Sequence, residues 1–309
     1  MSLKFWLGAL VFFCCSIAIS LNLLIFTPVY RLAFSSKKLS VYIIAFFNII
    51  TDLWILSILA MYLSVSIMAD RYIIAGEAGN FWSVLISGIW FCAWFMECLV
   101  QVVMAANRLV VITFQMYNVF TYRFTILVFF IVLACAATAT FIDQAVFPCC
   151  VFIMDHEVLS FRFLTVDGVY NYSNIVLMFF NLFGTITPSI CYVIVFITIR
   201  LSGAKVATHV SQDRKKQDIR YLIQFVSISI FYIFTWISFE SLPYIVPSGR
   251  VEWYVMVSIL VILNSSSNSV IYLSVNREVQ RTLPVPWLRH RLTKNVHNST
   301  TGMGAAVNN

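Results

Sequence analysis

Residues Trp82 to Phe114 read WSVLISGIWFCAWFMECLVQVVMAANRLVVITF, an apolar run with only two charged side chains, Glu97 and Arg108. The run is longer than the roughly 20 residues that a helix needs to cross the hydrocarbon of a bilayer. The composition agrees with a membrane environment. Of the 309 residues, 61% are hydrophobic and only 11% are charged, whereas about 25% of the residues of a soluble domain are charged. We therefore predict one membrane domain.

Charged residues and clusters of Pro and Gly separate seven apolar segments of this kind. Each must form a helix, because an unpaired backbone group in hydrocarbon costs several kcal/mol. The predicted fold is an all-α bundle of seven transmembrane helices within residues 1–283. The expected spans are about 5–27, 39–68, 82–114, 122–147, 172–199, 219–246 and 253–275. A short amphipathic helix is expected over 276–283, followed by a basic, disordered tail over 284–309.

The basic residues predict the orientation of this bundle. Sixteen of the 20 Lys and Arg residues fall on one side, at the connections after the first, third and fifth spans and in the tail. By the positive-inside rule, the N-terminus is outside and the C-terminus is cytoplasmic. The net charge of +7 is thus a signal of topology, and no nucleic-acid partner is expected.

Four carboxylates lie inside apolar spans, where each costs about 2.5 kcal/mol or more unless it finds water or a partner. Asp143 and Glu240 are near the outer ends of their spans and can reach water. Asp52 and Glu97 lie deeper and need partners. The candidate partners are Asn22, Asn48 and the run Asn264 to Asn268.

Several polar and aromatic landmarks now occur in a recognisable order. They are Asn22 in span one, Asp52 in span two, Arg108 at the end of span three, Pro188 in span five, Trp236 in span six and Asn268 to Tyr272 in span seven. This pattern resembles that of the rhodopsin-like G-protein-coupled receptors.

Departures from that pattern indicate a branch of the superfamily. Asn107 replaces the usual acidic residue before the arginine, Ser269 replaces the proline of span seven, and Ser83 stands where a bridging cysteine is expected. Together with DIRYLIQ at the start of span six and a Pro-Cys-Cys loop, these features most nearly resemble the srx class of nematode serpentine chemoreceptors. A sister nematode class or another divergent receptor group is the alternative.

The resemblance implies a chemosensory receptor for a small, mainly apolar ligand. Its implied partners are that ligand, the lipid bilayer and a heterotrimeric G protein, with a receptor dimer left open. The implied location is the plasma membrane of sensory cilia. A transporter or channel is the alternative function. An enzyme is disfavoured, because the sequence has no phosphate-binding loop, nucleophile elbow or spaced His and Cys cluster. No cofactor is expected.

Three groups of residues are candidates for function. The first is an activation switch, in which Arg108 pairs with Asp218 until an agonist moves span six; it comprises Arg108, Asp218, Asn268 and Tyr272. In the alternative interpretation, both charges only mark the edge of the membrane.

The second group is a buried polar core that binds sodium or shares a proton between its two carboxylates, because both cannot remain charged in a dry site. It comprises Asn22, Asp52, Glu97, Asn264, Ser265 and Asn268. A structural cluster without a regulatory role is the alternative, and no metal other than sodium is expected.

The third group is an aromatic ligand pocket with one or two polar side chains. It comprises Trp90, Phe91, Trp94, Gln101, Trp236, Phe239, Glu240 and Tyr244. Aromatic residues of membrane helices also serve as packing and interfacial anchors. A biogenic amine is disfavoured, because no carboxylate lies where amine receptors place one.

The loop before span five has two further candidates. Cys149 or Cys150 could bridge to Cys92, although spacing alone does not decide a disulfide. Asn171 begins a glycosylation sequon on the predicted outer side, very close to the start of the span.

Overall fold

The computed structural model describes residues 2–35, 40–74, 76–116, 118–147, 149–202, 209–247 and 249–284, and within these the side chains of all but 202, 209–225, 275 and 277. This part of the chain contains seven helices that are long and apolar enough to cross a membrane. Their bounds are α1 (Leu3–Ala33), α2 (Ser40–Ile58) with α3 (Ser64–Ala69), α4 (Phe81–Arg108), α5 (Tyr122–Phe141), α6 (Tyr172–Ser202), α7 (His209–Ile245) and α8 (Val255–Val275). The fold class predicted from the sequence, a seven-helix membrane bundle, is confirmed.

Short irregular turns extend several of these helices. A π-helical segment, Leu59–Leu63, joins α2 to α3, and similar segments, Leu109–Thr113 and Ile142–Val146, continue α4 and α5. A 3₁₀ turn, Val251–Tyr254, leads into α8. These turns lengthen the helices without breaking them, so that each still supplies its own backbone hydrogen bonds within the membrane.

The first helix is longer than the sequence predicts. The predicted span ends at about residue 27, before Pro28, but α1 continues through Pro28 to Ala33. A proline inside a transmembrane helix is tolerated when neighbouring groups satisfy the freed backbone. Pro28 and the following Val29 are both buried. After α8, the short helix α9 (Arg277–Thr282) lies where the sequence predicts a surface helix.

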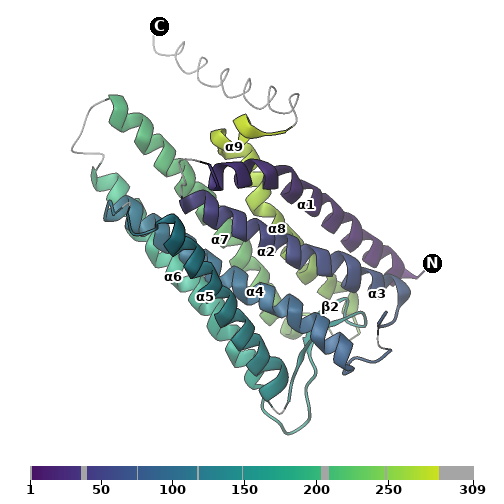
Figure 1. Ribbon diagram of the computed structural model, residues 1–309. Coiled ribbons are helices and arrows are strands. Elements are labelled where there is room, and N and C mark those ends of the chain that lie inside the picture. The colour runs from purple at the N-terminus through teal and green to yellow at the C-terminus, as the bar shows by residue number, and fades with distance from the viewer. Residues whose placement is uncertain are drawn as a thin grey trace.

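The helix α4 occupies the middle of the bundle. It contacts α2, α5 and α6 and also the β-hairpin described below, and most of its side chains are buried. The helices α1, α2 and α8 pack together on one side, and α7 closes the bundle between α6 and α8 (Figure 1). The helix α5 exposes Phe130, Ile131 and Phe141 on its outer surface, as expected for a helix that faces lipid.

A two-stranded antiparallel hairpin lies between α5 and α6. It consists of β1 (Phe152–Asp155) and β2 (Ser160–Phe163), with Phe152 opposite Phe163 and Met154 opposite Phe161. The sequence analysis expects only a loop here. The hairpin and the N-terminus lie at one end of the bundle, which we call the hairpin end, and α9 lies at the opposite end, the α9 end (Figure 1).

Candidate functional site

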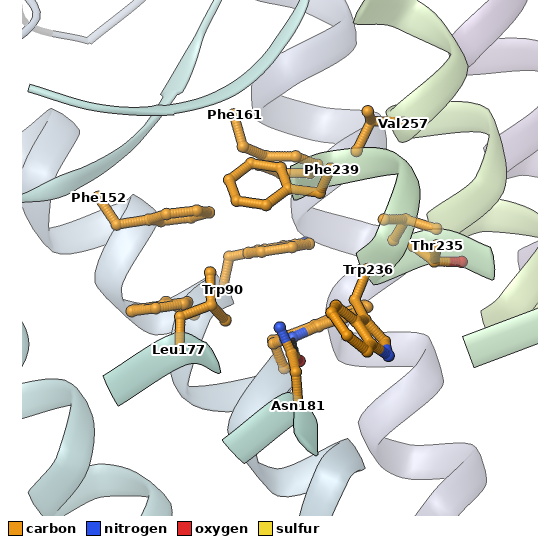
Figure 2. A pocket seen from close by; sticks show the side chains of 12 residues that line it. Trp90, Phe152, Phe161, Leu177, Asn181, Thr235, Trp236, Phe239 and Val257 are labelled. Atoms are coloured by element: carbon orange, nitrogen blue, oxygen red, sulfur yellow. Dashed lines mark hydrogen bonds between the residues drawn. The ribbon is translucent and has the colours of Figure 1, made fainter. Parts of the chain in front are cut away.

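An aromatic cavity lies below the hairpin, between α4, α6, α7 and α8. Figure 2 shows aromatic side chains facing this cavity from several elements. Its lining consists of Trp90, Phe91, Trp94, Phe152, Phe161, Leu177, Asn181, Thr235, Trp236, Phe239, Val257 and Val261. No charged side chain is among these lining residues.

The hairpin forms the outer wall of the cavity through stacked rings. Trp90 of α4 stacks against Phe161 of β2, with ring centroids 4.2 Å apart, and against Trp94 one turn along α4, at 5.9 Å. Phe152 of β1 stacks against Phe91 at 4.3 Å. Offset and stacked aromatic pairs contribute beyond the area that they bury, so the hairpin is fastened onto α4 at the cavity.

Backbone hydrogen bonds hold the hairpin in the same place. The backbone N–H of Met154 donates to Ser87 of α4 at 2.9 Å, and Ser258 of α8 donates to the carbonyl of Leu159 at 3.2 Å. The two strands therefore bridge α4 and α8 across the outer end of the cavity.

A polar group lies at the inner side of the cavity. Asn181 of α6 is 1% exposed, and its Oδ1 accepts hydrogen bonds from Trp94 Nε1 at 3.1 Å and from the hydroxyl of Tyr232 at 2.8 Å. On the adjacent face of α7, Trp236 Nε1 donates to Thr185 at 3.1 Å. These bonds connect α4, α6 and α7 around the cavity.

Five of the eight residues predicted for the pocket line this cavity: Trp90, Phe91, Trp94, Trp236 and Phe239. The other three do not. Gln101 is buried, but it lies seven residues beyond Trp94, about 10 Å deeper along α4. Glu240 of α7 is partly buried but is not among the residues that line the cavity. Tyr244 is 90% exposed, because it is turned about 80° from Trp236 around α7.

The sequence analysis missed seven lining residues, which are Phe152, Phe161, Leu177, Asn181, Thr235, Val257 and Val261. The sequence contains a recognisable pattern for two groups of these missed residues. Ser160 to Phe163 alternate large apolar with polar residues after the turn that follows Asp155, and such alternation is typical of a strand. Asn181 is a polar residue inside an apolar span, the same signal that drew attention to Asn22.

A second polar cluster lies deeper in the bundle. Asp52 Oδ2 of α2 accepts hydrogen bonds of 2.9 Å from both Asn48 and Asn268, and Glu97 of α4 accepts one from Asn264 of α8. All five side chains are buried. Each deep carboxylate thus has the amide partner that its burial requires.

Asn22 links α1 to α8 beside this cluster. Its Nδ2 donates to the carbonyls of Ala18 at 3.0 Å and Ser265 at 3.1 Å, and its Oδ1 accepts from the hydroxyl of Ser269 at 2.8 Å. Ser265 therefore takes part in the core through its backbone. Ser269 stands where the rhodopsin-like pattern has a proline, and its hydroxyl supplies a contact that a proline could not make.

Several oxygens of the polar core have no hydrogen-bond partner in the described part of the chain. They are Asp52 Oδ1, Glu97 Oε2, Asn264 Oδ1, Ser265 Oγ and Asn268 Oδ1. Hard cations prefer oxygen ligands of this kind, so the donor set fits sodium. Among the described residues, no group of three or more His, Cys, Asp or Glu side chains could hold another metal.

At the α9 end, the predicted switch is only partly described. Arg108 ends α4 and is 8% exposed, and Tyr272 of α8 is 3% exposed. Asn107 donates to Ser40 at the start of α2, at 3.2 Å. Asp218 lies on α7, but its side chain is outside the described residues. The pairing of Arg108 with Asp218 therefore stays a prediction.

The chain is similar to known proteins in both sequence and fold. Residues 12–276 match the family described as serpentine type 7TM GPCR chemoreceptor Srx. The chain belongs to the Srx family. The crystal structure of squid rhodopsin is similar to this Srx chain with a TM-score of 0.70 over 92% of this chain and 86% of the rhodopsin chain. Because the sequence identity is 12%, that likeness shows the fold alone. No curated protein sequence matches the chain.

The assignment confirms the resemblance found in the sequence. The Srx chain is a multi-pass membrane protein with the fold of a G-protein-coupled receptor. The family is described as one of chemoreceptors. It therefore favours a receptor over the transporter, channel and enzyme alternatives.

A cluster of charged groups anchors the hairpin of the Srx chain at its outer surface. Asp155, with no exposed side-chain surface, forms an ion pair with Arg162 across the hairpin. His156 lies between two carboxylates, with Nδ1 3.7 Å from Asp155 and Nε2 3.9 Å from Asp70. Lys4 donates to Asp70 at 2.6 Å, and this hydrogen bond lowers the pKa of the Asp70 carboxyl. The cluster connects the start of α1 and the end of α3 to the hairpin.

The cysteines of the Srx chain differ from the predicted bridge. Cys149 and Cys150 form a disulfide with each other, and Cys92 is a free, buried thiol on α4. The predicted bridge from the loop to Cys92 is therefore absent from the structure; Cys150, already in a disulfide, cannot also reach α4. Asn171 lies at the start of α6, where its side-chain oxygen accepts from the backbone N–H of Asn174 at 3.0 Å. Its glycosylation stays a prediction.

Proposed function

We propose that this Srx chain is a chemosensory G-protein-coupled receptor whose small, mainly apolar ligand binds in the aromatic cavity below the hairpin. The observation that carries the proposal is the uncharged aromatic lining, which is enclosed by the hairpin and contributed by α4, α6, α7 and α8. Concave, mostly apolar sites with a few placed polar groups are the usual sites for small ligands.

A movement of α7 would transmit ligand binding from the cavity to the α9 end. Trp236 and Phe239 of α7 line the cavity, and Trp236 is tied to α6 through Thr185. A ligand that favours another position of Trp236 would shift the population of α7 orientations. At the α9 end, such a movement would release Arg108 and open a cleft for a heterotrimeric G protein.

The polar core lies between these two ends and would set the balance between the two states. Sodium bound by Asp52, Glu97 and their neighbours would stabilise the state in which α2, α4 and α8 are packed as described. The structural alternative is that hydrogen bonds alone hold the core together, and signalling that ignores both sodium and Glu97→Ser would favour it.

The proposed receptor lies in the plasma membrane with its hairpin end outside and its α9 end in the cytoplasm, by the distribution of basic residues. The location in sensory cilia follows from the family and is a further part of the proposal. An epitope tag at the N-terminus should bind antibody on intact cells, whereas a tag at the C-terminus should bind only after permeabilisation. A receptor dimer stays a prediction.

A ligand screen with a G-protein or cyclic-nucleotide readout tests the proposal. Arg108→Ala should abolish the response at normal surface expression, because the buried cation at the proposed coupling end is lost. Arg123→Ala is the matched control, since Arg123 is an exposed arginine near the start of α5 at the same end. A ligand response that survives Arg108→Ala would contradict the receptor mechanism, and Asp218→Asn should raise basal signalling.

A further inference from the structure

The side-chain amide of Asn181 has one possible orientation in the cavity. Three donors converge on its Oδ1: Trp94 Nε1 at 3.1 Å, the Tyr232 hydroxyl at 2.8 Å and Cys98 Sγ at 3.8 Å. An indole N–H can only donate. The amide oxygen must therefore face Trp94, and a flipped amide would place two donors against each other.

In this orientation, the amide nitrogen of Asn181 points away from the three donors. This Nδ2 donates to no group in the described part of the chain, although the residue is 99% buried. Asn181 lines the cavity, and Figure 2 shows its amide at the edge of the space below Leu177 and Trp90. An N–H group beside an apolar lining gains free energy from a hydrogen-bond acceptor, so a bound ligand whose acceptor meets Asn181 Nδ2 should bind more tightly.

The other polar side chains of the lining either already make hydrogen bonds within the protein or, like the Asn181 amide nitrogen, are hydrogen-bond donors. Trp236 Nε1 donates to Thr185, and the hydroxyl of Thr235 donates to two backbone carbonyls, those of Phe231 and Leu260. Trp90 Nε1 is buried without a hydrogen-bond partner among the described residues. The amide N–H of Asn181 is thus the unused donor that the cavity offers, the Asn181 amide oxygen already accepts several hydrogen bonds, and no lining side chain carries a charge.

We propose that the cavity selects an uncharged ligand with an apolar body and one hydrogen-bond acceptor, of the ketone, aldehyde or ester class, and that Asn181 Nδ2 donates to that acceptor. The inference rests on the proposed function, since it names the ligand class of the same cavity. A protonated amine would find no carboxylate in the lining, and a carboxylic acid would lose its hydration without a counter-charge.

The test measures binding to the purified full-length chain in lipid nanodiscs, through quenching of its tryptophan fluorescence. The probes share one chain length: 2-heptanone, heptane, heptylamine and heptanoic acid. Val261→Trp, which fills the cavity, gives the background from partition into lipid. The wild-type chain should bind 2-heptanone at least tenfold more tightly than each of the other three. This comparison needs no variant that alters Asn181.

Asn181→Asp separates the donor from the acceptor. The carboxylate keeps an oxygen for Trp94 and Tyr232 but removes the N–H group that faces the cavity. The variant should lose the preference for 2-heptanone by at least tenfold and gain affinity for heptylamine, which can pair with the new charge. Ser189→Ala, on the exposed face of α6, should leave both affinities unchanged.

Three results would overturn the inference: equal binding of heptane and 2-heptanone, tighter binding of the amine or the acid to the wild-type chain, or a ketone preference that survives Asn181→Asp. Failure of all four probes to bind the folded chain would also overturn it. The outcomes are distinct from failure of the proposed function. If the ketone binds in an Asn181-dependent manner but activates no G protein, the inferred ligand class stands and the proposed receptor function fails. If a ligand without a hydrogen-bond acceptor activates signalling, the receptor function stands and the inferred ligand class fails.

Discussion

The contact between Asn22 and Ser269 gives a prediction whose size follows from the structure. The Ser269 hydroxyl donates to Asn22 Oδ1 at 2.8 Å, both side chains are fully buried, and Asn22 also donates across the interface to the Ser265 carbonyl. Interhelical hydrogen bonds inside membrane proteins contribute about 0.6 kcal/mol on average and up to about 1.7 kcal/mol. Ser269→Ala removes one such bond and should therefore cost about 0.6–1.7 kcal/mol.

Asn22→Ala removes two interhelical bonds and should cost about 1–3 kcal/mol. In the double variant, the Asn22–Ser269 bond is lost only once, so the coupling energy of the mutant cycle should be about 0.6–1.7 kcal/mol. The free energy of unfolding is measured by denaturation in bicelles. Ser20→Ala is the control, because the exposed Ser20 hydroxyl donates only to the Ser16 carbonyl of its own helix. It should change stability by no more than about 0.5 kcal/mol.

A coupling energy near zero would refute this reasoning. It would mean that the serine at the position of the usual proline does not join α1 to α8, and that Asn22 acts only through the backbone of α8. A large effect of Ser20→Ala would show instead that loss of any serine hydroxyl disturbs α1, which would remove the specific meaning of the cycle.

Three further predictions concern packing and the hairpin. Gly8→Ala should destabilise the protein by about 1–3 kcal/mol, because a Cβ there would lie 2.8 Å from the Ser64 carbonyl and 2.9 Å from the Met68 backbone nitrogen. At Gly88, the nearest atom to an added Cβ is 3.4 Å away. Gly88→Ala should therefore stabilise the protein by up to about 1 kcal/mol through helix propensity, in the same unfolding assay. Asp155→Asn removes the buried charge that pairs with Arg162 and should speed amide hydrogen exchange over 152–163 by about tenfold or more, whereas unchanged exchange would show that the stacked rings hold the hairpin alone. Lys4 lowers the pKa of the Asp70 carboxyl, so the pair stabilises the fold fully above the usual carboxyl pKa of about 3.9, and this stabilisation is lost as the pH falls through the lowered value. The difference in melting temperature between wild type and Asp70→Asn should therefore begin to shrink below about pH 4 and reach zero only below the lowered pKa, and a constant difference would exclude this linkage.

The fold was predictable because a bilayer leaves few choices. Seven apolar segments longer than a membrane crossing must be helices, and the structure has helices in all seven. The ends were less predictable. The helix α1 runs past Pro28, because burial of the adjacent turn outweighs the local preference of proline. The hairpin was missed, since its strands are four residues long and become stable only when their rings pack on α4.

The lining of the cavity was predictable from the sequence only where the residues concerned lie on a single helix. Trp90 and Trp94 are four residues apart, so helix geometry alone places both on one face, and both line the cavity. Phe161 enters the cavity from β2, and its position depends on tertiary contacts that no local pattern specifies. Tyr244 was predicted to line the pocket and is exposed, because the eight residues that separate it from Trp236 turn it about 80° around α7, a rotation that the prediction did not take into account.

In the proposed receptor, ligand binding in the cavity activates a G protein through this chain. Nucleotide exchange on a purified heterotrimeric G protein tests it directly, with the receptor in nanodiscs, 2-heptanone as the probe, and Val261→Trp as the variant whose cavity is filled. The probe should accelerate nucleotide exchange with the wild-type chain and have no effect with Val261→Trp. Probe-dependent exchange that persists when the cavity is filled would contradict the proposal, as would a probe that occupies the wild-type cavity and leaves exchange unchanged.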